Sequence, residues 1–225
     1  MSLFHVLQKE LQESGPITLQ AYMRRALTDP TYGYYIQRQP LGSAGVNGGD
    51  FTTAPEISQM FGELLGAWCA DLWHRMDSPA KLQLVELGPG RGTLMADLLR
   101  AASVLPAFSQ AVEVHFVEIS PTLRALQAEK VPDAHWHDGL AALPTSQGRP
   151  MIVLANEFFD ALPIQQFRKT DSGWDEMMVA EATEALVFTE RACDTAPFSP
   201  LQRLPEVETG DIVEACPDAE QVMRL

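Results

Sequence analysis

A glycine-rich turn between an apolar strand and a helix constrains the fold of this chain more than any other feature. Residues 82–87 (LQLVEL) predict a buried strand, and residues 93–102 (TLMADLLRAA) predict a helix. Between them, Gly88, Gly90 and Gly92 permit a sharp turn and let a ligand approach the backbone amides that open the helix. A strand, a glycine turn and a helix in this order indicate an α/β fold with a parallel sheet.

The sequence after this turn repeats the same alternation. Short apolar runs follow at 112–117, 134–137 and 151–155, and helical stretches come after the first two strands. This order predicts a Rossmann-like parallel sheet with crossover helices. Because the residues before the first strand are mostly helical in pattern, we expect an N-terminal helical cap segment (1–80) that covers the ligand site, and a sheet domain (81–225). Apolar alternation beyond residue 162 predicts antiparallel strands that decorate this sheet.

Composition excludes several classes of protein. Of the 225 residues, 46% are hydrophobic and 20% are charged, which is typical of a globular chain and not of a disordered one. The net charge of −14 opposes binding to nucleic acid. Three cysteines without a CxxC pair imply neither a disulfide framework nor a zinc site. The N-terminal pattern fits neither a signal nor a transit peptide, and no window is long enough for a membrane span, so we expect a cytoplasmic protein.

The spacing of the glycines favours one class of cofactor. A dinucleotide fingerprint requires its third glycine at position 93, where the chain has Thr93, and this disfavours NAD and dehydrogenase chemistry. Glu86 instead stands two residues before Gly88 in an E-x-G-x-G pattern. This pattern resembles motif I of class I S-adenosylmethionine-dependent methyltransferases. The resemblance implies that the turn holds the amino acid part of that cofactor.

Acidic residues stand where the following strands end. Glu118 follows the second strand, and ligands of doubly wound sheets lie outside the carboxyl ends of the strands, where an acid can accept both ribose hydroxyls. Asp138, after the third strand, is placed by the same rule to meet an adenine amine. NEFFDALP (156–163), after the fourth strand, adds Asn156, Glu157 and Asp160. The alternatives are solvated surface acids and, for NEFFDALP, a capping network.

Other residues have less specific patterns. His135 and His137 alternate on the short third strand and resemble a metal-binding pair, but no third ligand is marked nearby, which favours a structural role. Asp50 and Glu56 are candidates for lining the cofactor or substrate site. Trp68 and Trp73, in a long helical stretch after Pro55, are expected to lie in the core or to pack against other helices. Pro217 and Asp218 predict a helix whose apolar pattern stops with the sequence after about two turns, so we expect the sheet domain to be incomplete at its C-terminus.

Six segments occur in this order along the chain: GPI (15–17), DP (29–30), YGYY (32–35), GDFTTAPEIS (49–58), ELGPGRGTL (86–94) and NEFFDALP (156–163). Together they closely resemble the MidA-type family of class I methyltransferases, which is related to the mitochondrial complex I assembly factor that methylates an arginine of a complex I subunit. The resemblance implies a Rossmann-like fold, S-adenosylmethionine as cofactor and an arginine-bearing protein as substrate. Members of the family continue into further strands that are absent after Leu225.

An arginine acceptor suits the acids of the last segment. Its guanidinium remains protonated at neutral pH, and paired carboxylates can hold it through charge-assisted hydrogen bonds. We therefore predict Glu157 and Asp160 as catalytic residues and no metal. Methylation of a small molecule or another side chain, and a non-catalytic cofactor-binding assembly factor, are the alternatives. The predicted cofactor-binding residues are Glu86, Gly88, Pro89, Gly90, Gly92, Glu118, Ile119, Asp138 and Asn156.

Overall fold

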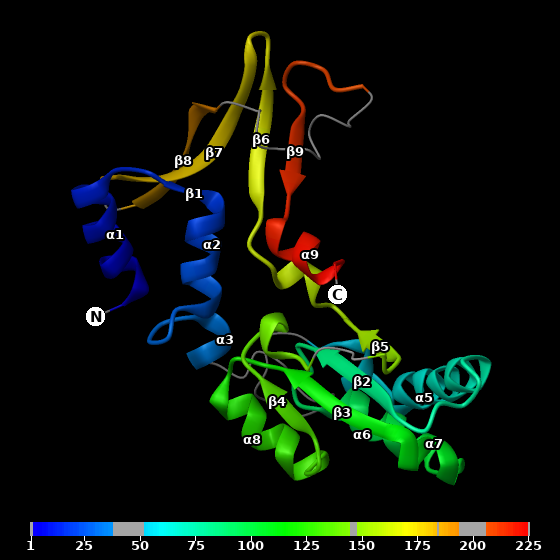
Figure 1. Ribbon diagram of the computed structural model, residues 1–225. Helices are drawn as coiled ribbons and strands as arrows, with labels where there is room; N and C mark the ends of the chain where they lie inside the picture. The colour runs from blue at the N-terminus through cyan, green and yellow to red at the C-terminus, as the bar shows by residue number, and fades with distance from the viewer. Residues whose placement is uncertain (1, 38–51, 145–147, 184, 194–205, 225) are drawn as a thin grey trace. The chain divides into compact units, whose positions relative to one another are not determined.

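The chain forms two compact units, one of residues 1–37 with 161–225 and the other of residues 38–160. The structure is a computed structural model that describes residues 2–37, 52–144, 148–183, 185–193 and 206–224 (Figure 1).

The unit of residues 38–160 is built on a four-stranded parallel sheet with strand order β4-β3-β2-β5. The predicted α/β fold with a parallel sheet and helices is therefore confirmed. Central β2 is buried over its whole length, as expected of a strand covered on both faces. The elements of this unit, seen mainly in cyan and green in Figure 1, are α4 (Ala54–Ile57), α5 (Gln59–Arg75), β2 (Leu82–Leu87), α6 (Thr93–Ala102), α7 (Pro106–Ala111), β3 (Val112–Val117), α8 (Pro121–Lys130), β4 (His135–His137), η1 (Leu140–Ala142) and β5 (Met151–Leu154).

The core of this unit lies between one face of the sheet and its helices. Phe108 of α7 packs edge-on against Trp73 of α5, with ring centroids 5.6 Å apart, and both belong to the same buried cluster as Phe116 of β3. Trp73 thus lies in the core as expected. Trp68 does not lie in the core, because half of its surface is exposed on α5. The predicted long helix is also broken at Ser58, which is extended and caps α5 by accepting a hydrogen bond from the backbone of Met60.

The other unit contains a five-stranded antiparallel sheet centred on β7. Ile17 of β1 pairs with Val179 of β7, and the two join Leu19 of α2 in a small core. A second core contains Phe167 of β6 and Ala215 of β9. The elements are α1 (Leu3–Ser14), β1 (Ile17–Thr18), α2 (Leu19–Thr28), α3 (Tyr34–Gln37), β6 (Gln165–Thr170), β7 (Gly173–Ala182), β8 (Ala185–Cys193), β9 (Ile212–Ala215) and α9 (Pro217–Val222), while η2 (Phe159–Ala161) crosses the division.

This division differs from the predicted boundary at residue 80. Helix α5 packs with α6 and the core of the parallel sheet, so it does not belong to a separate N-terminal segment. The antiparallel strands predicted beyond residue 162 are present, but they form their own sheet with β1, and the expectation that they decorate the parallel sheet is wrong. In the part of the chain that the structure describes, no helix is long and apolar enough to cross a membrane.

Candidate cofactor site at the carboxyl ends of the parallel strands

The glycine turn connects β2 to α6 and requires glycine at both ends. Gly88 has φ +61° and donates its backbone N–H to the carbonyl of Val117, 3.0 Å away, so the turn is tied to the end of β3. A Cβ on Gly88 would lie 2.9 Å from Cδ2 of Phe158. Gly92 has φ +74°, and a Cβ there would lie 3.2 Å from the Cα of Gln127. Side chains at these two positions would therefore be strained and would meet neighbouring segments.

Glu86 places a carboxyl group beneath this turn. It is 3% exposed, in the middle of the sheet, and burial raises the pKa of its carboxyl group to about 8. Its Oε2 has no hydrogen-bond partner among the residues that the structure describes. Because an unpartnered buried carboxyl group is costly, it needs an explanation beyond packing. Its place two residues before the glycine turn fits a role in holding a polar ligand group.

Glu118 stands at the end of β3 and is also buried. Its Oε1 accepts a hydrogen bond from the backbone N–H of Ser120 at 2.8 Å, and its own backbone N–H donates to the carbonyl of His137. Burial raises the pKa of this carboxyl group, while the hydrogen bonds from Ser120 and Gln127 oppose the rise. The next residue, Ile119, is 42% exposed. The end of β3 thus offers an acid beside an exposed apolar side chain.

Helix α8 holds these groups in place, which the sequence did not indicate. The side chain of Gln127 is fully buried, and its Nε2 donates to the carbonyl of Gly90 at 2.7 Å and to Oε2 of Glu118 at 3.3 Å. One turn earlier, Arg124 donates to the carbonyl of Glu118. Neither residue belongs to a recognisable motif, and the contacts join residues up to 37 positions apart, so only the fold reveals them.

Asp138, after β4, lies on the surface. Its side chain is 90% exposed and forms an ion pair with Arg124, with Nη2 and Oδ1 2.6 Å apart. Arg124 therefore connects the residues that follow β3 and β4. Because Asp138 is so exposed, this ion pair contributes little to stability.

The NEFFDALP segment follows β5 and reaches the glycine turn through Phe158, the side chain that faces Gly88. Glu157 has φ +49°, which is unusual for a residue other than glycine, and its side chain is exposed. Asp160 is also exposed, and Asn156 is half-buried. Two predicted carboxylates are therefore available to solvent next to the segment that contacts the turn.

A second polar network lies at the start of α6. The Thr93 hydroxyl donates to Oε1 of Glu56 at 2.6 Å and accepts a hydrogen bond from Nζ of Lys130. Burial lowers the pKa of the Lys130 ammonium group. Glu56 thus contacts the first residue of the helix after the turn, whereas Asp50 lies outside the described residues.

Three histidines gather on one face of the sheet, one more than the sequence marked. Nδ1 of His115 lies 3.1 Å from Nε2 of His137, and the rings of His115 and His135 stack with centroids 5.2 Å apart. Burial lowers the pKa of His115, which favours its neutral form. No cluster of three or more histidine, cysteine or acidic side chains suited to a metal ion occurs among the described residues.

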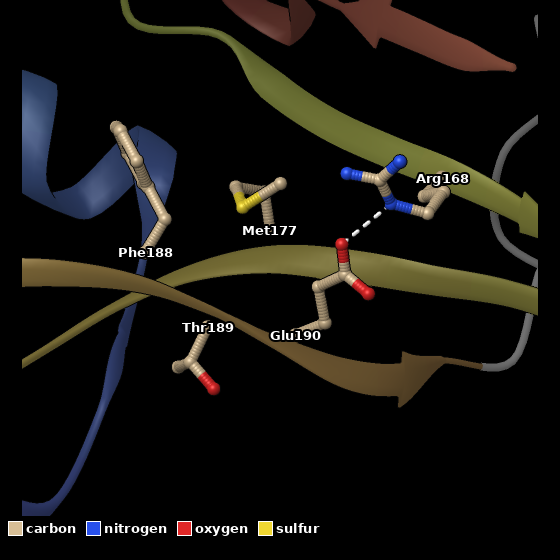
Figure 2. Close-up of a pocket in the computed structure, with 5 residues that line it drawn as sticks. All are labelled: Arg168, Met177, Phe188, Thr189 and Glu190. Carbon is tan, nitrogen blue, oxygen red and sulfur yellow. Dashed lines mark hydrogen bonds and ion pairs between the residues drawn. The ribbon is translucent and has the colours of Figure 1, made fainter. Parts of the chain in front are cut away.

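A hollow of about 540 Å³ lies in the other unit, on the antiparallel sheet (Figure 2). Arg168 and Glu190 form an ion pair across it, with Nε and Oε1 2.6 Å apart, and Phe188 beside them is 69% exposed. Met177 and Thr189 complete its lining. None of the predicted site residues lines this hollow.

Known proteins were compared with this sequence and structure. Mitochondrial protein arginine methyltransferase NDUFAF7 is 39% identical in Mus musculus, over 99% of this chain and 55% of the relative, and 38% identical in Homo sapiens, over 96% and 53%. The chain thus spans about half the length of these curated relatives. Both relatives are named as mitochondrial proteins, so they do not support the cytoplasmic location expected from the sequence.

Solved structures agree with this relationship. The fold matches a COG1565 superfamily protein from Burkholderia thailandensis, described as a candidate methyl transferase and bound to S-adenosyl-homocysteine, with a TM-score of 0.80, 29% identity and coverage of 99% of this chain and 58% of that one. A native crystal structure of a COG1565 superfamily protein from the same organism gives a TM-score of 0.76 at 28% identity, over 99% of this chain and 56% of that one.

The profile of the Methyltransf_28 family matches residues 64–225, which include the glycine turn, the acid after β3 and the NEFFDALP segment. The chain therefore belongs to this family of S-adenosyl-L-methionine-dependent methyltransferases.

Proposed function

We propose that this chain binds S-adenosylmethionine at the carboxyl ends of β2 and β3 and takes part in methylating an arginine side chain of a protein. The observation that carries the proposal is the glycine turn between two buried acids, Glu86 and Glu118, of which only Glu118 has partners for both oxygens among the residues that the structure describes. The names of the curated relatives and the ligand of the Burkholderia structure support the cofactor and the acceptor.

The described residues fit this cofactor. Glu86 has an unpartnered buried oxygen that would accept hydrogen bonds from the ammonium group of the amino acid part. Glu118 already accepts one hydrogen bond at each oxygen, and since a carboxylate oxygen can accept two, the ribose hydroxyls would find free lone pairs there. Ile119 would cover one side of the base. When bound, the cofactor supplies an electrophilic methyl group.

The acceptor would be held by Glu157 and Asp160. Both carboxylates are exposed, and the neighbouring Phe158 contacts the glycine turn. Paired acids would bind the guanidinium in one orientation and accept the proton that its nitrogen loses when the new N–C bond forms. Much of the acceleration of such an in-line displacement comes from this positioning.

Calorimetric titration of the chain with S-adenosylhomocysteine and, in parallel, with NAD tests the cofactor. We expect saturable binding of S-adenosylhomocysteine and none of NAD. Saturable binding of NAD alone, or of neither compound, would overturn the proposed function.

Product analysis on arginine-bearing protein substrates tests the acceptor. Glu157→Gln should lower arginine methylation by about tenfold or more, which corresponds to about 1.4 kcal/mol of lost transition-state stabilisation. Glu129→Gln, at an exposed position on α8, is the matched control and should leave the rate unchanged. Full methylation by Glu157→Gln would contradict the assigned role. Methylation of a small molecule but of no arginine would favour the alternative acceptor.

Two expectations from the sequence remain predictions. The expectation that the chain does not bind nucleic acid rests on its net charge of −14. The cytoplasmic location rests on the sequence pattern, and imaging of the tagged protein in its own cell would test it against the mitochondrial names of the relatives.

A further inference from the structure

One buried side chain connects three segments of the site without belonging to any motif. The amide of Gln127 donates to the carbonyl of Gly90 and to Oε2 of Glu118, and its Oε1 accepts from the indole N–H of Trp136 at 2.8 Å. A side-chain amide has two N–H donors, and in Gln127 they bind two acceptors. These hydrogen bonds fix the orientation of the amide group. The backbone of the same residue occupies the space beside Gly92.

We propose that Gln127 is a positioning residue for the cofactor: its amide fixes the distance between the glycine turn and the acid at the end of β3. This inference rests on the proposed function, in which those two groups hold different halves of the same molecule. The two acceptors follow different strands, because Gly90 lies in the turn after β2 and Glu118 comes directly after β3. The backbone hydrogen bond from Gly88 to Val117 also links the ends of these two strands. A site of this kind binds well only when its parts are held in place before the ligand arrives.

A purely structural role for Gln127 makes a different prediction. The same side chain also satisfies Trp136, a partly buried residue that packs against the core. If Gln127 acted only as a core hydrogen-bond partner, removing either end of the bond to Trp136 would lower stability and leave affinity alone. If Gln127 positions the site, loss of its N–H donors should lower the affinity for S-adenosylhomocysteine, whereas loss of the hydrogen bond to its Oε1 should not.

Calorimetry with S-adenosylhomocysteine on three chains separates these roles. Gln127→Met keeps the volume of the side chain and removes the hydrogen bonds, and we expect the affinity to fall by about tenfold or more. Trp136→Phe removes the bond to Oε1 together with part of the ring that packs against the core, and we expect a lower melting temperature with an affinity within about threefold of wild type. Wild-type affinity in Gln127→Met, or equal losses of affinity in both variants, would overturn the proposal.

A second variant covers the case in which Gln127→Met does not fold. Gln127→Glu keeps the shape and an acceptor for Trp136 but replaces the two N–H donors with a carboxyl group beside Glu118 that can donate through one O–H at most, and we expect the affinity to fall as well. An affinity equal to that of wild type would overturn the proposal. Failure of the wild-type chain to bind S-adenosylhomocysteine is a different result, because it overturns the proposed function itself.

Coupling to Glu118 gives a readout that a general loss of stability would not change. The double variant of Gln127→Met and Glu118→Gln should lose less affinity than the product of the two single fold-losses. The reason is that both substitutions remove the same hydrogen bond between Gln127 and Glu118, which positions the acid for the ligand. Fold-losses that simply multiply would show that the two side chains act independently, and that result would overturn the proposed link between them.

Discussion

Replacing Glu86 by glutamine should make the chain more stable and its cofactor site weaker. In the folded chain, burial raises the pKa of this carboxyl group from its usual 4.5 to about 8. Folding at neutral pH therefore requires the group to take up a proton that the unfolded chain has released. Each pH unit between the two pKa values adds about 1.4 kcal/mol to this cost. At pH 7 the cost is about 3 kcal/mol, and a glutamine does not bear it.

The stability of the wild type should fall as the pH rises from about 4.5 to 8. Below about pH 4.5 the group is protonated in both states and costs nothing; as the pH rises toward 8, only the unfolded chain releases the proton, so the stability of the wild type falls. The gain of Glu86→Gln should therefore grow from near zero at pH 4.5 to its largest value near pH 8. Above pH 8 the gain should stay constant.

Urea unfolding at pH 5, 6, 7 and 8, followed by tryptophan fluorescence, measures this difference. The control is Glu129→Gln, which removes the same charge from an exposed position and should leave the pH dependence as in the wild type. If the free energies of unfolding of Glu86→Gln and wild type differ by the same amount at all four pH values, Glu86 does not take up a proton on folding. Glu86→Gln should also bind S-adenosylhomocysteine about tenfold more weakly or worse, because glutamine cannot take on the negative charge that a bound ammonium group would favour at this position.

Two further substitutions test the geometry. Gly88→Ala should lower both stability, by about 1–3 kcal/mol, and affinity for S-adenosylhomocysteine, because its φ of +61° is strained for alanine and the new Cβ would lie 2.9 Å from Phe158; unchanged thermal unfolding and calorimetry would contradict this. Thr18→Ala removes the side-chain cap of α2, which accepts from the backbone of Ala21 at 3.1 Å, and should cost about 1 kcal/mol in urea unfolding without changing affinity. A loss of affinity in Thr18→Ala would show that the two units are coupled in binding.

The sequence predicted those parts of the site that depend on local pattern. The apolar run of β2, the glycines after it and the acid after β3 lie within a few residues of the element ends that position them, and the parallel sheet follows from that order. Phe158 is near Gly88 because β5 pairs with β2, and neighbouring parallel strands end at the same edge.

What sequence reasoning missed depends on contacts between distant positions. Gln127 lies inside a helix, where glutamine is common, and its contact with Gly90 spans 37 residues. Ile17 pairs with Val179 across most of the chain, which places the first residues in the antiparallel sheet. Trp68 has the spacing of a core residue but faces solvent, because the core takes up the side of α5 that carries Trp73. Periodicity predicts an apolar face but not which neighbour covers it.

A crystal structure of the chain with S-adenosylhomocysteine would show directly whether the cofactor binds between the glycine turn and Glu118. We predict the nucleoside at the end of β3 with its ribose hydroxyls on Glu118, and the amino acid part at the glycine turn above Glu86. The contradicting result is a complex in which the compound lies elsewhere while both acids remain without contact to it.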